Sequence, residues 1–420
     1  MESNYHICNH NHIPQIEAVD LSDYNAIIDK IAKDLHDGKI TSKDINQDLI
    51  NQTYKDLTNG VSKGFGTDFT KLGKDAGNDT AVLEMHKNIY RFSHAKSMVE
   101  LHEINKALYD GEQMRQFPEF RNEVEKINVR YNKNYLETEY TTARNAAEHA
   151  RKWQEYQADK KLFPNLKYMT VADDRVRDEH QALHGIIKPI DDDFWNNYFP
   201  PNGWNCRCYT VQTAEKADEG KYEDKTVPQT FIGNVGKTGV IFSKGQSFFQ
   251  IAKELGTNET NKAFELSKLE VPLIKRYKSP SGAKVNVSPW TDTRPDELSG
   301  NYKVAVVLAD KEKLNVDLLA HLDGWIVKDK SNPEYRINGK IADRKAPEST
   351  NYKKSLSRAN EQGCEIVVVD LSKNKDTIEN AEAKIDNVLK LDNVHTNIKE
   401  VYIVSSDRKT VKHYKRKKQS

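Results

Sequence analysis

The sequence predicts a multidomain protein whose two halves differ in class. We expect a mostly α N-terminal half with an irregular, motif-bearing domain, and an α+β C-terminal domain with a small antiparallel sheet. A chain of 420 residues is too long for one ordinary domain. Apolar residues recur at helical spacing before about residue 160, and form short runs between turn residues after about residue 265.

Six segments follow from these shifts in pattern. The segment at 214–262 is charged and contains six glycines, which is typical of a connection between domains. We predict a flexible N-terminus at 1–20, a helical region at 21–129, a motif-bearing domain at 130–215, a linker at 216–264, an α+β domain at 265–415 and a basic tail at 416–420.

The composition is polar and almost neutral, with 37% hydrophobic residues, 30% charged residues and a net charge of +1. No stretch approaches the roughly 20 apolar residues that a membrane span needs. The first 15 residues lack the apolar core of a secretory signal. Four cysteines are too few for a disulfide framework in this length. We expect reduced thiols and synthesis in the cytoplasm, without a signal peptide.

The elements of the N-terminal half follow from local signals. Ile27, Ile28, Ile31 and Leu35 are spaced as on one helix face. Residues 41–44 read as a capping box that opens the next helix. Residues 60–77 are expected to be a loop, and 122–161, without Gly or Pro, a long exposed helix or helix pair. His6, Cys8, His10 and His12 are interpreted as part of a floppy tail.

The C-terminal elements follow from apolar runs and turn signals. Asn338-Gly339 is a strong type I′ hairpin signal, and Gly363 is placed to end a helix. The predicted strands are 304–308, 325–327, 335–337, 341–345, 365–371, 401–404 and 410–414, and the predicted helices are 311–322, 352–362 and 377–391.

Two histidines and two cysteines gather in the motif-bearing domain. His180 and His184 are spaced to share one helix face, and Cys206 and Cys208 follow 22 residues later. Two imidazoles and two thiolates form a set that Zn²⁺ accepts in structural sites. The alternative, favoured by the tight Cys-x-Cys spacing, is a packed core without metal.

The surrounding charges favour a fold-organising role for this motif. We expect buried ion pairs among its Asp and Arg residues, for instance Asp174 with Arg207. The motif offers no nucleophile with an aligned base, so a catalytic role is disfavoured.

The motif also carries a family resemblance. It reads Asp-Asp-Arg-Val-Arg-Asp-Glu-His-Gln-Ala-Leu-His-Gly at 173–185, Asp-Phe-Trp at 193–195, and Pro-Pro-Asn-Gly-Trp-Asn-Cys-Arg-Cys at 200–208. This order resembles the phage head morphogenesis proteins of the Mu F-like, SPP1-type minor head family over about 130–215. The resemblance implies a minor capsid protein of the virion. Its partners would be portal proteins and capsid or scaffold proteins, and the helical region 21–129 would contact the portal or the scaffold.

A second resemblance lies in the C-terminal domain. Asn332-Pro-Glu-Tyr335, 337–345, Arg358-Ala-Asn-Glu-Gln-Gly363 and 366–371 are similar to the toxin nucleases at the C-termini of CdiA contact-dependent inhibition proteins. Related phage-borne domains are barnase, EndoU, colicin and RelE-like nucleases. The resemblance implies an endoribonuclease of tRNase type, with RNA such as tRNA as substrate and an immunity protein as partner.

The residues allow two ways of cleaving RNA. A metal-independent ribonuclease, the favoured reading, needs a base, an acid and cations around the phosphate. Its candidates are Asp343, Lys345, Lys340, Arg358, Gln362 and His413, with Ser355 as a further hydrogen-bonding residue. The alternative is Mg²⁺-dependent cleavage, because Pro333-Glu334 followed by Asp343-Arg-Lys345 mimics a pattern of two metal-binding carboxylates and a lysine.

Three functions remain open at this point. The chain is a minor head protein with a nuclease toxin domain, or a purely structural head protein whose C-terminal domain binds nucleic acid or the portal without catalysis, or a polymorphic toxin that uses the Mu F-like domain for delivery. Seven basic residues against one acidic residue at 407–418 favour salt-sensitive contact with phosphates, although such a tail is usually a solubilising end.

Overall fold

A computed structural model describes residues 21–66, 79–220, 222, 227–328, 331–390 and 394–416. It divides into two compact units: the first contains 1–64, 95–233 and 243–252, and the second contains 65–94, 234–242 and 253–420. Helix α3 (Asp79–Ala107) contributes residues to both. The N-terminal residues His6, Cys8, His10 and His12 lie outside the described part. Among the described residues, no helix is long and apolar enough to cross a membrane.

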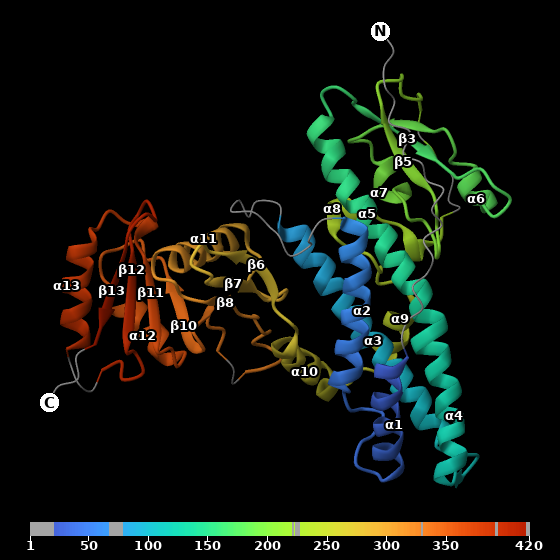
Figure 1. The fold of residues 1–420 in the computed structure, drawn as a ribbon, viewed down its shortest axis with the longest axis horizontal. Helices are drawn as coiled ribbons and strands as arrows, with labels where there is room; N and C mark the ends of the chain where they lie inside the picture. The colour runs from blue at the N-terminus through green and yellow to red at the C-terminus, as the bar shows by residue number, and fades with distance from the viewer. Residues whose placement is uncertain are drawn as a thin grey trace. The chain divides into compact units, whose positions relative to one another are not determined.

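The first unit is mostly helical (Figure 1). Its apolar spacing places Ile28, Ile31 and Leu35 in the core, as predicted. The charged stretch after 121 is helical, as expected, but it is not simply exposed, because alanines and Trp153 form a buried face. The helices are α1 (Ser22–His36), α2 (Gln47–Phe65), α4 (Phe117–Val129), a π-helical segment (Arg130–Tyr135) and α5 (Leu136–Asp159), with a short hairpin of β1 (Tyr109–Asp110) and β2 (Gln113–Met114).

Two N-terminal expectations need correction. Asp44 does accept hydrogen bonds from the backbone and hydroxyl of Thr41, but these close a turn and open no helix. Helix α2 begins at Gln47, where Asn46 accepts from the backbone N–H of Leu49 over 2.9 Å. The expected loop at 60–77 is helical up to Phe65, and its part at 67–78 lies outside the described residues.

The motif-bearing region contains a sheet that the sequence did not reveal. Three antiparallel strands are ordered β4-β3-β5, with short helices between them. These elements are β3 (Asn165–Met169), α6 (Asp178–Gln181), β4 (Ile187–Pro189), α7 (Phe194–Tyr198) and β5 (Tyr209–Thr213).

The segment expected to be a linker contains regular structure. Thr257 caps one of its helices in a capping box with Thr260. The elements are a 3₁₀ turn (Gln229–Phe231), α8 (Val235–Thr238), α9 (Ser247–Leu255), α10 (Asn258–Ser267) and a second 3₁₀ turn (Lys268–Glu270).

The second unit is built on one mixed sheet of eight strands, ordered β13-β12-β11-β10-β9-β8-β7-β6. The α+β class is confirmed, and the sheet is larger than predicted and includes three parallel pairs, β7 with β8, β10 with β11 and β11 with β12. Its elements are β6 (Ile274–Lys278), β7 (Lys284–Val287), α11 (Pro295–Lys311), β8 (Val316–Leu318), β9 (Tyr335–Ile337), β10 (Lys340–Lys345), α12 (Lys353–Glu361), β11 (Ile366–Asp370), a 3₁₀ turn (Leu371–Lys373), α13 (Ile378–Leu389), β12 (Glu400–Val404) and β13 (Val411–Lys415).

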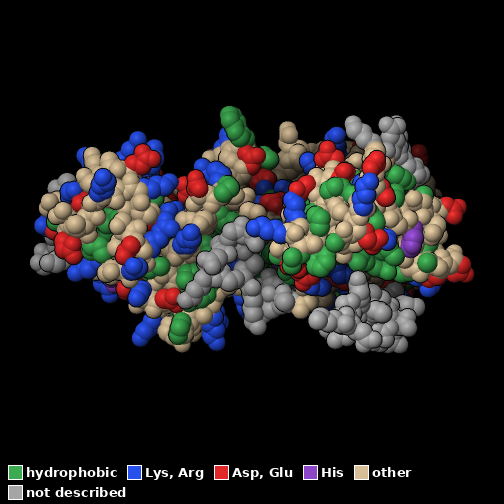
Figure 2. Space-filling view, turned by 90° about the horizontal axis from the view of Figure 1, so that it is seen from above, with side chains coloured by type: hydrophobic (Ala, Val, Ile, Leu, Met, Phe, Trp, Pro, Cys, Tyr) green, Lys and Arg blue, Asp and Glu red, His purple; other side chains and the backbone are tan. Residues whose placement is uncertain are grey.

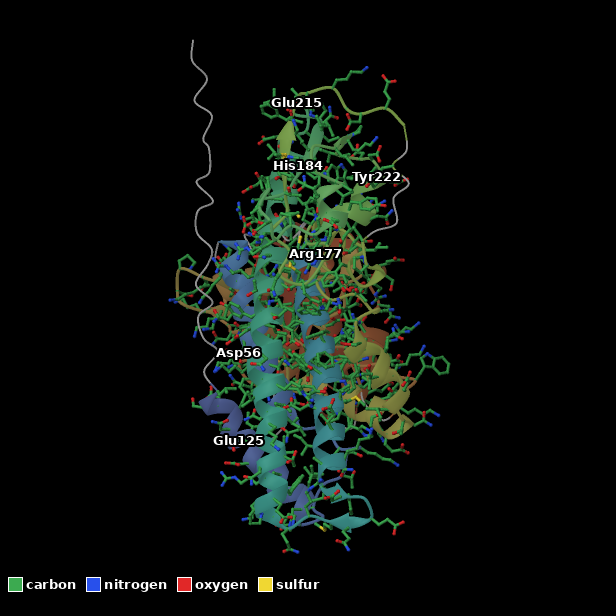
Figure 3. All side chains as sticks on the ribbon, turned by 90° about the vertical axis from the view of Figure 1, so that its right-hand side faces the viewer. Asp56, Glu125, Arg177, His184, Glu215 and Tyr222 are labelled. Carbon is green, nitrogen blue, oxygen red and sulfur yellow. The ribbon has the colours of Figure 1, made fainter. Side chains whose placement is uncertain are left out.

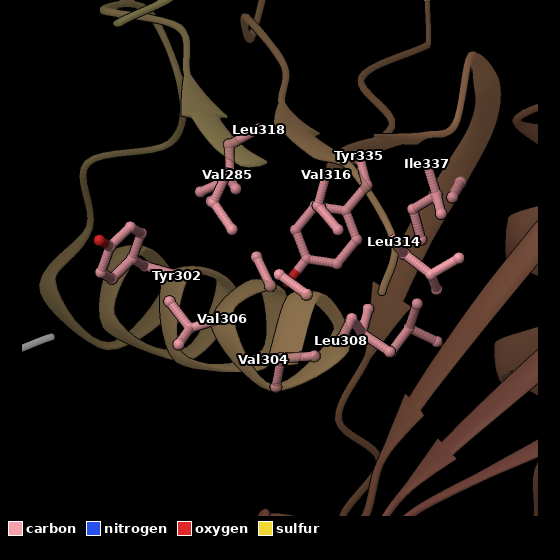
Figure 4. Close-up of a cluster of buried hydrophobic side chains, with 14 of the residues drawn as sticks. Val285, Tyr302, Val304, Val306, Leu308, Leu314, Val316, Leu318, Tyr335 and Ile337 are labelled. Carbon is pink, nitrogen blue, oxygen red and sulfur yellow. The ribbon is translucent and has the colours of Figure 1, made fainter. Parts of the chain in front are cut away.

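Helices cover both faces of this sheet. Figure 4 shows α11 with side chains of β7, β8 and β9 packed against it. Helices α12 and α13 pack with the opposite face. Strand β11 is buried on both faces, since Val368 belongs to the α11 cluster and Val367 and Val369 belong to the α12 and α13 cluster. Alternation along each strand therefore decides which helical layer a side chain meets.

Several C-terminal expectations are confirmed. Asn338 and Gly339 have φ values of 45° and 85° and join β9 to β10, as the hairpin signal predicted. Gly363, with φ 76°, follows α12, and Thr377 caps α13 by accepting from the backbone N–H of Asn380. The strands predicted at 335–337, 341–345, 365–371, 401–404 and 410–414 are present as β9 to β13.

Three C-terminal predictions were wrong. The apolar run 304–308 is part of helix α11, which begins at Pro295. The expected helix at 311–322 contains strand β8 instead. The expected strand at 325–327 includes a turn in which Trp325 is 90% exposed. Short apolar runs fit a buried helix as well as a strand, so tertiary packing decided these cases.

Candidate active site

The candidate active site is built around strand β10, in which side chains alternate between the two faces of the sheet. Asp343 and Lys345 lie two residues apart and share one face of the strand, as the sequence indicated. Asp343 is 1% exposed. Glu334 lies directly before β9, and its backbone N–H donates to Oδ1 of Asp343 over 3.3 Å. The hairpin therefore brings residues from its two arms to one place.

Lys345 is held on both sides. Its ammonium forms an ion pair with Oδ2 of Asp343 and donates to Oε1 of Gln362 over 3.0 Å. Gln362 follows α12, and its Nε2 donates in turn to the carbonyl of Asn332 over 3.3 Å. The lysine side chain is 20% exposed, so its ammonium is fixed yet reachable from solvent.

Glu334 is oriented from the other side. Nδ2 of Asn301, on α11, donates to its Oε2 over 2.6 Å. Nε2 of His321 lies 3.5 Å from the same oxygen. Asp292, His321 and Glu334 offer ligand atoms that all lie within 4.8 Å of one another. The side chains thus form a continuous polar cluster within the second unit.

Burial and charge shift the pKa values of this cluster in different ways. Burial raises the pKa of Asp343, the nearby Glu334 raises it further, and Lys345 opposes both. Burial on its own would lower the pKa of His321, but Glu334, Asp292 and Asp343 outweigh it, so that the net pKa is raised. The acidic residues therefore repel one another, and Lys345 and His321 offset part of that repulsion.

An ion-pair network lies on the opposite face of β10. Arg344 donates to Asp370 over 2.9 Å, and to Oδ1 of Asn301 over 3.0 Å. Arg408 also donates to Asp370 over 2.9 Å. Asn301 therefore contacts both Arg344 and Glu334, which links the network to the candidate site.

Two predicted catalytic residues, Lys340 and His413, lie together elsewhere in the second unit. Lys340 pairs with Glu400 over 2.7 Å, and Nε2 of His413 lies 2.8 Å from the other oxygen of Glu400. The His413 ring stacks on Tyr402. Arg358 is exposed on α12. The structure thus joins Asp343, Lys345 and Gln362, while Lys340 and His413 gather at Glu400. Arg358 lies one helical turn before Gln362, whose backbone N–H donates to its carbonyl.

The surface charge gives no single-sign field in the view shown. Figure 2 shows basic and acidic side chains interspersed over the visible face. Within the basic segment 407–418, Lys412 lies 3.5 Å from Glu382 and Lys409 lies 3.8 Å from Asp407. These cations are partly offset by neighbouring carboxylates.

In the first unit, three of the four predicted metal ligands come together. Nδ1 of His180 lies 3.7 Å from Sγ of Cys206 and 3.5 Å from Sγ of Cys208. The three residues are between 2% and 4% exposed. Their ligand atoms lie within 4.8 Å of one another. Contact with Cys208, opposed by burial and helped by His180, holds the pKa of the Cys206 thiol well below its usual value.

His184 is not part of this cluster. Helix α6 ends at Gln181, so the helical spacing that was expected to pair His184 with His180 is not maintained. Nδ1 of His184 instead accepts from the backbone N–H of Thr170 over 3.1 Å, and the side chain is exposed. Figure 3 labels His184 and Arg177 in this part of the first unit.

The expected ion pair of Arg207 involves a different aspartate. Arg207 makes a bidentate contact of 2.6 and 2.7 Å with Asp173, one residue before the predicted Asp174. The hydrogen bonds from Arg207 are the main reason why the pKa of Asp173 is lowered to about 2. Arg177 donates to the carbonyl of Trp204 over 2.7 Å. Both arginines fix the loop that carries the cysteines.

Sequence reasoning missed several residues of the candidate site. Asp292, Asn301 and His321 reach Glu334 from other parts of the fold. No motif or regular spacing in the sequence links these residues to the 333–345 pattern. A long-range contact of this kind has no local signal.

Comparisons with known proteins identify two segments. The family described as Phage Mu protein F like protein matches residues 101–211, which include the His/Cys cluster. The family described as the contact-dependent growth inhibition CdiA C-terminal domain matches residues 330–410, which include Glu334, Asp343, Lys345 and Gln362. The chain therefore contains a Mu F-like phage head domain followed by a CdiA C-terminal toxin-like domain.

Individual relatives match shorter stretches. The putative capsid assembly protein F of Escherichia phage Mu is 51% identical over 47 residues, 11% of each chain. The Mu-like prophage FluMu F protein of Haemophilus influenzae is 35% identical over 100 residues, 24% of this chain and 23% of that protein. The chain thus aligns with less than a quarter of either relative. A CdiA-CT/CdiI toxin and immunity complex from Burkholderia pseudomallei is 20% identical, with a TM-score of 0.23, over 30% of this chain and 88% of that chain.

Proposed function

We propose that this chain is a phage minor head protein acting in head morphogenesis at the portal, and that its C-terminal unit is an endonuclease that cleaves RNA with the help of a divalent cation. One observation carries the enzymatic part. The buried carboxylate of Asp343 is joined to the backbone of Glu334 and to the ammonium of Lys345. Two carboxylates and a fixed lysine on one hairpin form the set that metal-assisted phosphodiester hydrolysis uses.

The donor set fits Mg²⁺ on chemical grounds. The carboxylate of Glu334 lies with Asp292 and His321 in a group whose ligand atoms are within 4.8 Å of one another, and Asp343 contacts the Glu334 backbone. Carboxylate oxygens are the ligands that hard cations prefer. The pKa of Asp343 is raised by burial and by Glu334, so a cation would relieve a repulsion that Lys345 only partly offsets. When bound, Mg²⁺ supplies Lewis-acid stabilisation of charge on the phosphate.

The remaining steps belong to the side chains. The ammonium of Lys345 attracts the phosphate and orients a water molecule, because Asp343 and Gln362 restrict its position. Asn301 holds Glu334 in place through its 2.6 Å hydrogen bond. His321, with its raised pKa, lies beside Glu334 and can carry a proton near neutral pH.

The metal-dependent reading is supported over the metal-independent one by the positions of the cations. The sequence assigned phosphate binding and proton transfer in a metal-independent mechanism to Lys340, Arg358 and His413, and the structure describes no ion pair or hydrogen bond between any of them and Asp343. Lys340 and His413 instead share Glu400. The choice of RNA rests on the resemblance to contact-dependent inhibition toxins.

The enzymatic proposal is tested with the purified full chain, incubated with RNA and with DNA, in Mg²⁺ and in EDTA. We expect RNA cleavage that requires Mg²⁺, stops in EDTA and returns with excess Mg²⁺. Equal cleavage in EDTA would support the metal-independent alternative. A folded chain that cleaves neither substrate would support a non-catalytic domain.

The head role is supported by the Mu F-like match at residues 101–211 and by a relative named as a capsid assembly protein. Portal and capsid proteins are the proposed partners, and an immunity protein is proposed for the toxin-like domain. Co-purification of the full chain with a portal protein tests this role. If the chain arrests bacterial growth but does not bind a portal protein, the result would favour the alternative of a polymorphic toxin that uses the Mu F-like domain for delivery.

A further inference from the structure

The strongest site outside the proposed nuclease centre is the His/Cys cluster of the first unit. Its three ligand atoms are Nδ1 of His180 and the sulfurs of Cys206 and Cys208, with distances of 3.7 and 3.5 Å from the nitrogen to the two sulfurs. Zn²⁺ bonds to nitrogen at about 2.0–2.1 Å and to sulfur at about 2.3 Å, so ligand atoms around one ion lie about 3.5–4 Å apart. The observed spacing matches that separation without rearrangement.

The imidazole of His180 is oriented as a metal ligand. Its Nε2 lies 3.3 Å from the carbonyl oxygen of Asn202, which can only accept a hydrogen bond. This contact favours a proton on Nε2, so that Nδ1, which faces both sulfurs, is the ring nitrogen that would bind a metal ion. A ring N–H donated to a backbone carbonyl is the usual support for a zinc-binding histidine.

Helix α5 fixes the cysteine loop from behind. Nδ2 of Asn145 donates to the carbonyl of Cys206 over 3.1 Å. Nε2 of His149, one helical turn later, lies 3.1 Å from the carbonyl of Cys208. Both contacts use backbone oxygens and leave the sulfurs directed at His180. Such preorganisation favours binding, because little conformational freedom is lost when the ion enters.

We propose that His180, Cys206 and Cys208 form a zinc site that ties the Cys-x-Cys loop to the segment carrying α6, and that His184 has no part in it. Thiolate and imidazole ligands select Zn²⁺ over the hard cation proposed for the nuclease centre. Three protein ligands leave one tetrahedral position to a water molecule. This inference is independent of the nuclease proposal.

The full chain, purified under reducing conditions, provides the test. We expect about one zinc per chain by elemental analysis, and thiolate-to-metal charge-transfer absorption when Co²⁺ replaces zinc. Cys206→Ser and His180→Ala should each lose most of the metal. His184→Ala is the matched control from the same motif and should retain it.

The wild-type measurement keeps the proposal testable even if a variant fails to fold. A wild-type chain without zinc after incubation with Zn²⁺, and without the cobalt absorption, would overturn the proposal in favour of a packed, metal-free cluster. Zinc that persists at full level in both Cys206→Ser and His180→Ala would also overturn it, since the metal would then be held elsewhere, for example by His6, Cys8, His10 or His12.

Discussion

The backbone N–H of Glu334 donates a 3.3 Å hydrogen bond to Oδ1 of Asp343, nine residues later in the chain. This single contact places the two acidic residues of the 333–345 pattern at one site. It exists because the Asn338-Gly339 turn folds β10 back along β9. A local turn signal thus creates the proposed catalytic geometry.

Gln362 is expected to act as a positioning residue, because it contacts Lys345 and not the reacting groups. Gln362→Ala should lower kcat for RNA cleavage by about 10- to 100-fold, the usual effect of removing an outer support. KM should change less than kcat. Ser357→Ala, on the same helix and hydrogen-bonded to Glu361, is a control, and equal losses in both variants would contradict this role.

The buried Arg344 is expected to be important for the stability of the second unit. Its removal leaves Asp370, whose side chain is 0% exposed, with Arg408 as its remaining ion-pair partner. Because Arg408 still pairs with Asp370, Arg344→Met should cost about 1–3 kcal/mol of unfolding free energy, the usual effect of leaving a buried acceptor such as Asn301 without its partner. Hydrogen exchange of the α11 amides measures this loss. Lys340→Met breaks a more exposed pair and should cost less than about 1 kcal/mol.

Glu100 should make the first unit less stable as pH rises. Burial raises its pKa from 4.5 to about 8, against the opposing charge of Lys96. A raised carboxyl pKa means that the folded state holds a proton which the unfolded state has lost between these two pH values. Its contribution to stability should therefore fall by about 1.4 kcal/mol per pH unit over this range and stay constant above it.

Glu100→Gln should remove that slope, because the amide keeps the acceptor for Asn132 and does not titrate. Chemical unfolding of the first unit at several pH values from 5 to 9 would measure the difference between variant and wild type. A difference that does not change with pH would contradict the assignment. Glu139, whose pKa is also raised by burial, supplies a background slope common to both proteins.

Gly64 permits the close approach of α2 to α5. A Cβ at this position would lie 1.9 Å from the backbone oxygen of Arg144, which cannot move like a flexible side chain. Gly64→Ala should destabilise the first unit by at least about 1–3 kcal/mol. Gly245→Ala, whose Cβ would meet its neighbours at 3.5 Å, is the control. Similar unfolding temperatures for the two variants would refute this explanation.

Local patterns predicted much of the second unit's sheet. The alternation of β10 put Asp343 and Lys345 on one face, and Gly363 and Thr377 marked the end and the start of helices. The run at 304–308 misled because a helix buried on most sides carries no clear period. Its assignment depended on packing against strands far away in sequence.

The sequence predicted site residues correctly only where they lie close together in one motif. His180, Cys206 and Cys208 come together as the motif suggested, whereas His184 does not, because α6 ends one turn too early for the helical rule to apply. Asp292 and His321 join Glu334 only through the tertiary fold. No periodicity or turn signal in the chain specifies such contacts.

The most direct test of the account compares two lysines of the same strand. In Mg²⁺, we predict that Lys345→Met lowers the rate of RNA cleavage by the full chain about 10²- to 10⁴-fold. Lys340→Met, which removes a lysine paired with Glu400, should cleave at close to the wild-type rate. Wild-type activity in Lys345→Met, or an equal loss in Lys340→Met, would contradict the proposed nuclease centre.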